Sequence, residues 1–401
     1  MGLAESQFST FYLGKSTVEA TEPATYETII PTGHSLEANA GSFQSEDIDP
    51  SGLAADSFRT NVSGRGDLSA HWRPGCFDKA LETGLLSAFA AADTDTLTVS
   101  FSAVSNGIQT ITDDGATGAL AAYPVGCGIV VGGAVADPLN AGLRTVLVAG
   151  ANVISVYNPT GVVSAADAGV SISHQGFISL GVTKSWQWAE RVFSDGVNLI
   201  YSEFYKRCLV GNLSWSFPAA GPSRITIGLQ GEAPTVVKAN GSPPITKQRT
   251  GTDNPAVTDR LVHGMDDVRS VILYKPSVGI VELHDLMSLF EFQVQRNIRQ
   301  DPAVGTANIV NTSPGRPSVG GRANAFINSV IRGTPQMVEW LLSNPDDVSL
   351  HAVIGANDTD AYTFYLPTLR FQAAGTPVGG NDQAMYINGQ FSGTNIRITR
   401  F

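Results

Sequence analysis

The chain repeats one short pattern, and this internal duplication constrains its fold more than any other feature. Val-Ser-Gly-Arg at 62–65 and Val-Gly-Gly-Arg at 319–322 each lead into a strand-like run and then into a segment with helical spacing, at 77–87 and 335–343. The second segment opens with Thr334 followed by proline, a typical helix start. A shared order of elements is stronger evidence for duplication than any single tetrapeptide. The sequence therefore predicts one β unit written twice, each copy with a flanking helix.

The spacing within the two copies also agrees. Arg65 precedes Leu85 by 20 positions, and Arg322 precedes Leu341 by 19. Comparable strands precede the pattern at 35–39 and 288–292, and comparable strands close each copy at 225–231 and 385–391. The predicted repeat-equivalent structural positions are Gly64, Arg65, Leu85, Leu86, Gly321, Arg322, Leu341 and Leu342.

This duplication predicts the organisation of the chain. The expected segments are an N-terminal arm at 1–34, a first unit at 35–231, a Pro-rich linker at 232–266 and a second unit at 267–401. The first unit carries an insertion at about 105–171 that is rich in Gly and Ala and contains short strands. The linker has few apolar residues and several charges, which is typical of an arm rather than of a core.

Periodicity favours strands through most of the chain. Alternating or β-branched runs occur at 97–101, 146–148, 213–217, 225–227, 271–274 and 362–365, and turn residues separate them. Because helical spacing appears only in the two repeated segments, the predicted fold class is mainly β, with two tandem sandwich or half-barrel units.

Charge is scarce in this chain. Lys and Arg number 25 against 36 Asp and Glu, so the net charge is −11 and charged residues make up 15% of the chain. That fraction lies below the about 25% that is usual in soluble domains. The negative balance argues against tight nucleic-acid binding, which depends on cations that neutralise phosphates. Since 42% of the chain is hydrophobic, disorder of the whole chain is excluded.

Motifs for chemistry are lacking, so no catalytic, cofactor-binding or metal-binding residue is predicted. Cys76, Cys127 and Cys208 form neither a disulfide framework nor a CxxC pair. The six histidines show no metal-ligand spacing, and there is no nucleophile elbow. Acid pairs lie beside turn residues, where solvated carboxylates are usual. The chain is therefore expected not to be an enzyme.

The sequence also bears on location. The first residues have no basic and apolar signal pattern, so synthesis and retention in a cytoplasm are expected. The uncharged stretch at 115–136 contains Pro124 and few large aliphatic residues, which favours a buried or intersubunit β segment over a membrane span.

Several of these elements resemble the major tail tube proteins of long-tailed, siphovirus-like bacteriophages, in the form with a tandem tube domain. The resemblance rests on Glu-Pro-Ala-Thr-Tyr-Glu-Thr-Ile-Ile-Pro at 22–31 with Ser-Leu-Glu at 35–37, on Gly-Arg-Gly-Asp-Leu-Ser at 64–69, on Ser-Trp-Gln-Trp-Ala-Glu at 185–190, on Gly-Asn-Leu-Ser-Trp-Ser at 211–216 and on the closing strand at 225–231. It covers most of the chain apart from the insertion and the linker.

The resemblance implies rings in which inner sheets join into a closed barrel, stacked into a tube for genome ejection. Three chains with two units each would form a pseudo-hexameric ring, and six chains per ring remain an alternative. Implied partners are further copies of the chain, a tape-measure protein inside the tube, tail-terminator and tail-tip proteins, and viral DNA that passes without specific binding. No membrane partner and no cofactor are implied, and the expected location is the phage tail.

Acids on the inner strands are then expected to line the channel, because an acidic wall repels phosphates. The candidates are Glu37, Asp67 and Glu291. The alternative function is a β-sandwich adhesin or carbohydrate-binding surface protein, which would use the same short strands and low charge.

Overall fold

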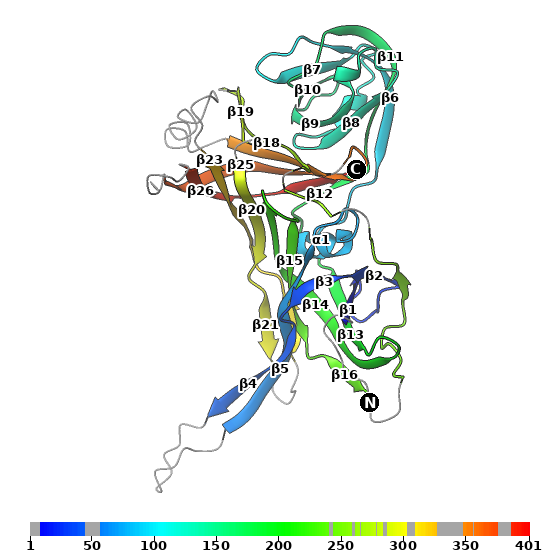
Figure 1. Ribbon diagram of the computed structural model, residues 1–401, viewed down its shortest axis with the longest axis vertical. Coiled ribbons are helices and arrows are strands. Elements are labelled where there is room, and N and C mark those ends of the chain that lie inside the picture. The colour runs from blue at the N-terminus through cyan, green and yellow to red at the C-terminus, as the bar shows by residue number, and fades with distance from the viewer. Residues whose placement is uncertain are drawn as a thin grey trace.

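The computed structural model is elongated and built almost entirely of strands, which confirms the mainly β class. It describes residues 9–44, 57–239, 244–258, 261–264, 266–277, 279–283, 287–302, 309–326, 348–355, 357–375 and 386–401. A strand barrel lies at one end of the molecule, and the hairpin of β4 (Glu37–Gln44) and β5 (Ser57–His71) projects at the other (Figure 1).

The first unit and its linker contain most of the early elements. Their bounds are β1 Ser9–Ser16, β2 Thr25–Ile29, β3 Pro31–His34, β4 Glu37–Gln44, β5 Ser57–His71, α1 Asp78–Leu85, β12 Gly176–Ser179, β13 Trp186–Ser194, β14 Leu199–Pro218, β15 Arg224–Glu232, β16 Thr235–Lys238 and β17 Thr252–Asn254. The described part of the expected N-terminal arm, 9–34, is β1 to β3, and β1 pairs with β13 along its whole length. These residues belong to the first unit because Phe11, Leu13 and Ile29 are buried in its core.

The inserted barrel and the second unit contain the remaining elements. The barrel consists of β6 Asp93–Phe101, β7 Ile108–Asp113, η2 Ala119–Ala122, β8 Gly128–Gly133, η3 Pro138–Asn140, β9 Gly142–Val148, β10 Val153–Tyr157 and β11 Ser164–His174. The second unit consists of β18 Val268–Lys275, β19 Gly279–Glu282, β20 Met287–Arg296, β21 Arg299–Pro302, β22 Ile309–Ser313, β23 Pro317–Phe326, β24 Val348–Gly355, β25 Ala361–Gly375, β26 Tyr386–Gly393 and β27 Arg397–Arg400.

The strand pairing of the first unit is repeated in the second. In the first unit β1 pairs with β2 and β13, β13 with β14, β14 with β15 and β16, β15 with β5, and β5 with β4. In the second unit β18 pairs with β19 and β24, β24 with β25, β25 with β26 and β27, β26 with β23, and β23 with β20. The duplication seen in the sequence is therefore present in the topology.

One long strand in each unit serves two sheets. The first half of β14 pairs with β13 and β16 in an outer sheet, and its second half pairs with β15 on one edge and with β20 of the second unit on the other. The inner strands of both units thus form one sheet in the order β4, β5, β15, β14, β20, β23, β26, β25. We call it the inner sheet.

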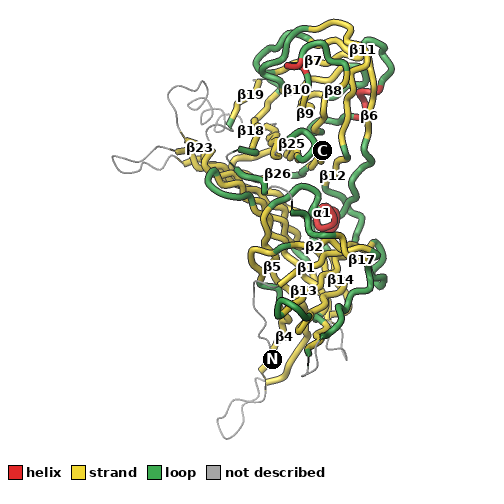
Figure 2. Tube along the Cα trace, turned by 45° about the vertical axis from the view of Figure 1, so that its right-hand side comes forward, coloured by secondary structure: helices red, strands yellow, loops and turns green. Residues whose placement is uncertain are grey.

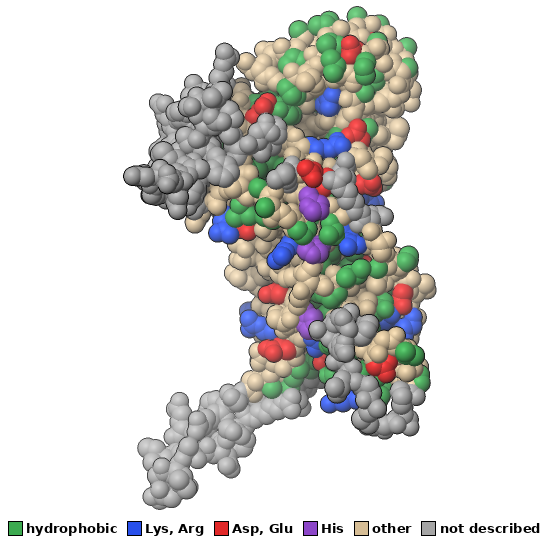
Figure 3. Space-filling view, in the orientation of Figure 1, with side chains coloured by type: hydrophobic (Ala, Val, Ile, Leu, Met, Phe, Trp, Pro, Cys, Tyr) green, Lys and Arg blue, Asp and Glu red, His purple; other side chains and the backbone are tan. Residues whose placement is uncertain are grey.

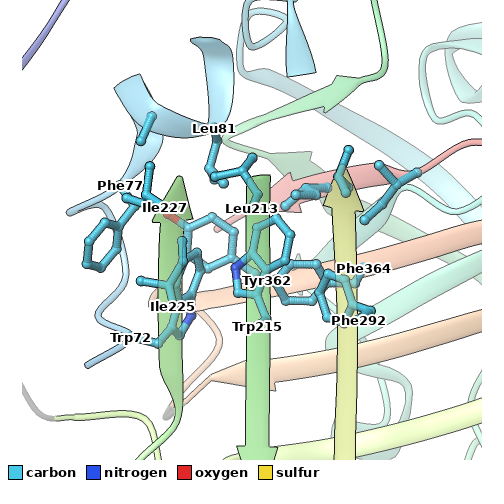
Figure 4. Packing of buried hydrophobic residues seen from close by; sticks show 14 of the residues in the cluster. Trp72, Phe77, Leu81, Leu213, Trp215, Ile225, Ile227, Phe292, Tyr362 and Phe364 are labelled. Atoms are coloured by element: carbon cyan, nitrogen blue, oxygen red, sulfur yellow. The ribbon is translucent and has the colours of Figure 1, made fainter. Parts of the chain in front are cut away.

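A single hydrophobic core lies under the inner sheet and contains side chains of both units (Figure 4). The rings of Trp215 and Phe292, from β14 and β20, are stacked with centroids 4.6 Å apart. Trp72 packs edge-on against Trp215 and Tyr362. Because these rings come from both units, the units share one core rather than forming separate domains.

The one helix of the described residues covers part of this core. Helix α1 lies close to the predicted 77–87 and packs against strands of the first unit and β12 (Figure 2). Its buried face includes Leu81 and Leu85, and it ends at Leu86, which adopts a left-handed conformation with its N–H bonded to the carbonyl of Glu82. The second predicted helix, with Leu341 and Leu342, lies outside the described residues.

The insertion is a closed six-stranded barrel with a core of its own, in the order β10, β7, β6, β11, β8, β9. It spans 93–174 and encloses the expected 105–171. The uncharged stretch at 115–136 supplies η2 and β8, and Leu120, Cys127 and Ile129 from it are buried. A closed barrel has no exposed strand edges.

This barrel is inserted in the first unit but packs on the second. Gly128 donates a backbone hydrogen bond to Thr399 Oγ1 at 3.2 Å, and Tyr157 donates to Glu282 at 2.7 Å. Two small apolar clusters join the surfaces, one around Leu143 and Val353 and one around Leu147 and Ile272. The barrel therefore covers the outer sheet of the second unit.

The outer sheet of the first unit is covered by part of the linker. Arg249 lies with its guanidinium carbon 3.3 Å from the centre of the Tyr12 ring and forms ion pairs with Glu190 and Asp253. The side chains of Arg249 and Glu190 are 2% and 0% exposed, so this pair is buried. Residues 244–254 are thus held against their own first unit.

Candidate functional site

The candidate site is the polar face of the inner sheet. Side chains alternate along each inner strand, so that Leu68 and Ala70 of β5 enter the core while Asp67 and Ser69 lie on the opposite face. The same alternation places uncharged polar groups on that face, namely Ser69, Asn212, Ser214, Ser216, Thr226, Gln230, Gln293, Gln295, Ser318, Asn324, Gln390 and Ser392.

All three predicted acids lie on this face. Glu37 is on β4, Asp67 is on β5, and Glu291 is on β20, three strands beyond β5. Glu37 is paired across the strands with Arg65, and the backbone N–H of Asp67 donates to Ser35 Oγ at 2.9 Å. The sheet thus brings Glu37 and Asp67 to neighbouring strands and places Glu291 in the equivalent part of the second unit.

The two units place the same three residue types in the same cross-strand row. Glu37 is opposite Arg65, and Arg65 is opposite Gln230. Glu291 is opposite Arg322, and Arg322 is opposite Gln390. We call each set a Glu–Arg–Gln row. Gly64 and Gly321 precede the two arginines and occupy equivalent positions in β5 and β23.

Each row lines a shallow groove in the polar face. The groove of the first unit, about 360 Å³, contains Glu37, Arg65 and Gln230. The groove of the second unit, about 420 Å³, contains Glu291, Arg322 and Gln390. The site is therefore present twice in one chain.

The row of the second unit is closed by an ion pair. Arg322 Nε donates to one oxygen of Glu291, and Ser216 Oγ from β14 donates to the other at 2.9 Å. The hydrogen bond and the charge of Glu291 raise the pKa of Arg322 above its usual value. The side chains of Arg322 and Glu291 are 52% and 27% exposed, so the pair faces solvent and contributes little to stability.

The row of the first unit is open. Within the described residues no ion pair joins Glu37 to Arg65, and the edge of β4 opposite β5 has no strand partner. In the second unit that edge of β20 is occupied by β14, which supplies Ser216. The two rows therefore differ at the strand edge beside the glutamate: β14 occupies that edge in the second unit, and no described strand occupies it in the first.

Much of the net negative charge lies away from this face. The barrel, 93–174, contains six Asp and one Arg and thus carries five of the eleven net negative charges. On the polar face each of Glu37 and Glu291 has an arginine on the next strand. Figure 3 shows red and blue side chains intermixed along the two units and few charges on the barrel. The face is mixed in charge rather than uniformly acidic.

Other chemistry-bearing groups are placed in the interior. Burial raises the pKa of each of Cys76, Cys127 and Cys208 to about 12, which makes these thiols poor nucleophiles. The described residues hold no group of three or more His, Cys, Asp or Glu side chains that could bind a metal ion. No helix in the described part of the chain is long and apolar enough to cross a membrane.

Sequence reasoning found part of this site. The repeated Gly-Arg pattern identified Arg65 and Arg322, but Gln230 and Gln390 were not singled out. Their signal is their position in the two closing strands, at 225–231 and 385–391. Comparison with known proteins adds nothing to this geometry, since no protein-family model and no curated protein matches the chain.

Proposed function

We propose that this chain is a structural subunit that assembles head to tail into rings, and that stacked rings form a phage tail tube for genome ejection. The observation that carries the proposal is the joint between β14 and β20. There the inner strands of two copies of one unit pair over seven residues on each strand, from Asn212–Gln295 to Pro218–Leu289. The chain thus contains one complete example of the joint that a ring would repeat.

The ends of the inner sheet supply the other half of that joint. Among the described residues, β4 is equivalent to β20 but pairs only with β5 along 37–44. Residues 370–375 of β25 are equivalent to the second half of β14 but pair, within the same described part of the chain, only with β26. Unpaired strand edges attract further strands. Joining β25 of one copy to β4 of the next is a heterologous contact, which closes into a ring when the rotation permits.

The dimensions of such a ring suit a channel. Eight inner strands in each of three chains give about 24 strands, and at about 4.8 Å per strand the wall has a circumference of about 115 Å. The backbone diameter is then about 37 Å before strand tilt widens it. A ring of six chains would be about twice as wide, and the ring size distinguishes the two arrangements.

The polar face would form the inner wall. Ser, Thr, Asn and Gln dominate it, whereas apolar side chains of the same strands point to the core. A wall of this kind offers hydrogen bonds to water, and its acids offset most of the charge of its arginines, so few unbalanced cations are left to hold phosphates. A tape-measure protein inside the tube, terminator and tip proteins at its ends, and DNA in transit are the partners of this arrangement, with the phage tail as its location.

The barrel gives less support to a carbohydrate-binding role. Its only aromatic residues are Phe101, Tyr123 and Tyr157. The first two are buried, and the hydroxyl of the third is bonded to Glu282 of the second unit. Sugar rings commonly pack on exposed aromatic faces, and the barrel does not present such a platform.

Electron microscopy of concentrated protein tests the proposal. Hollow filaments with a regular axial repeat are expected, and monomers at every concentration would contradict it. Ala38→Lys with Ala40→Lys, on exposed positions of β4, should prevent filaments because lysines on an edge oppose strand pairing. Ala149→Lys with Ala151→Lys, on an exposed barrel hairpin, adds the same charge and should leave filaments unchanged.

A further inference from the structure

We propose that the Glu–Arg–Gln row is a charge-compensated contact point for the phosphate backbone of duplex DNA, in which the glutamate masks the arginine. This inference rests on the proposed function, because it concerns the wall of the proposed channel. It differs from a uniformly acidic wall, in which acids act by net repulsion alone.

The two units carry the same row. The repeated strands differ in most of their residues, yet Glu, Arg and Gln occupy the same three cross-strand positions twice. A general need for polar side chains would be met by any of the Ser, Thr or Asn residues that fill the rest of the face. The match indicates that this combination of groups is itself required.

The closed row of the second unit leaves part of its arginine accessible. Arg322 contacts Glu291 through Nε, and no other hydrogen bond of its guanidinium lies within the described residues. Its side chain is about half exposed and lines the groove. The guanidinium is thus held at the surface by one nitrogen, with its terminal nitrogens available to a passing phosphate.

The cation of each row is an arginine rather than a lysine. Every cation that the described inner strands place on the polar face is an arginine: Arg65, Arg224, Arg322 and Arg370. A guanidinium matches a carboxylate or a phosphate with its planar fork, whereas an ammonium is a point charge. Arginine can therefore pair with the glutamate and still present donors to a phosphate oxygen.

The physical consequence follows from counterion release. An unmasked arginine that contacts a phosphate releases a counterion, so repeated contacts add up to strong and salt-dependent binding. Six rows per ring, repeated along a tube, would hold DNA in place. With a glutamate beside each arginine the row has no net charge, and the DNA gains hydrogen bonds without this cumulative attraction.

The row of the first unit lies at the proposed ring joint. Glu291 receives its second hydrogen bond from Ser216 of the preceding unit. Glu37 lies on the free edge of β4, where the β25 strand of the next copy would take the place of β14. Closure of the ring would thus bring a second neighbour to Glu37, as β14 does for Glu291.

The test uses the full-length soluble chain and a short DNA duplex, with binding followed by fluorescence anisotropy at several salt concentrations. Glu37→Gln with Glu291→Gln keeps the size of both side chains and the acceptor for Ser216. It unmasks Arg322 by removing its ion-pair partner, and unmasks Arg65 by removing the negative charge opposite it on β4. We expect binding about tenfold or more tighter at low salt, with a slope of log K against log salt that is steeper by about two. Thermal unfolding of the variant checks that it is folded.

The matched control is Asp93→Asn with Asp114→Asn on the barrel, which makes the same change in net charge and should bind as weakly as the wild type. Adding Arg65→Gln and Arg322→Gln to the unmasked variant should abolish the gain. Equal binding by the unmasked and control variants would overturn the inference. Filament formation by the wild type is scored separately, so failure of the tube and failure of the masking are different results.

Discussion

Gly126 of the barrel lies directly against the ring of Tyr365 in the second unit, so closely that a side chain at 126 would overlap the tyrosine. Gly126 also has a φ of +78°, a backbone conformation that favours glycine. The contact lies in the interface that joins the barrel to the outer sheet of the second unit.

Gly126→Ala should therefore destabilise the protein by about 2–4 kcal/mol, from left-handed strain and overpacking together. Gly118→Ala is the matched control, because Gly118 has a φ of +80° but no atom within 4 Å of the added Cβ. It should cost only about 1–2 kcal/mol. Urea unfolding measures both, and equal losses would show that the contact with Tyr365 is not tight.

The buried ion pair of the linker predicts that Glu190 stabilises the fold. Glu190→Gln removes a carboxylate that accepts bonds from Ser202 Oγ at 2.6 Å and from the backbone of Gln248 at 2.7 Å and pairs with Arg249. Arg249 keeps its ion pair with Asp253, but the buried network loses one charged acceptor, and we expect a loss of about 1–3 kcal/mol. Limited trypsin digestion should also cut the linker faster.

The control for this variant is Lys247→Gln. Its ion pair with Asp253 is 3.1 Å long and has 44% exposure on the lysine side chain. Exposed pairs contribute about 0–1 kcal/mol, so its unfolding curve should almost coincide with that of the wild type. A Glu190→Gln variant as stable as Lys247→Gln would show that residues 244–254 are not anchored.

The shared core predicts that the two units unfold together. Trp215→Ala removes a fully buried indole stacked on Phe292 and should cost about 3–5 kcal/mol. Because the lost contact lies between the units, calorimetry should show one transition for both, shifted to lower temperature. Trp186→Ala, at a half-buried position, should shift it less. Separate transitions for the two units would contradict a common core.

A buried histidine predicts sensitivity to acid. His351 is 1% exposed, and burial lowers its pKa to about 3. The unfolded chain takes up this proton near pH 6.5 and the folded chain does not, so stability falls as pH drops from about 6.5 towards 3. His351→Gln removes this titrating group. In urea unfolding between pH 6 and 4, the free energy of unfolding of the variant should therefore depend less steeply on pH than that of the wild type. The difference in slope should be up to one proton, or about 1.4 kcal/mol per pH unit. Parallel curves for the two proteins would contradict it.

The sequence predicted features that depend on local pattern. The strand at 213–217 and the helix at 77–87 were placed because alternation and helical spacing are visible within a few residues, and β14 and α1 confirm them. The two arginines of the rows were found because the Gly-Arg pattern recurs. Side chains alternate along β5 and β23, and this alternation puts both arginines on the same face of the inner sheet.

The remaining features depend on partners far along the chain. Residues 244–254 carry charges and turn residues, so composition indicated a free arm, but the burial of Arg249 is set by Glu190 on β13. The barrel was expected only as short strands, because its closure requires β7 to meet β10 and β6 to meet β11. The contact of Gly126 with Tyr365 likewise joins residues that no local pattern relates.

The placement of the barrel has a consequence for synthesis of the chain. A ribosome completes 93–174 before it begins the second unit, and domains generally fold in that order. The barrel can close early, but Leu143 and Leu147 then stay exposed to solvent until their partners Val353 and Ile272 have been synthesised. In nascent chains that have passed residue 174 but not yet residue 353, at least part of this surface is thus open to other proteins, and a chaperone acting on this protein would have its target there.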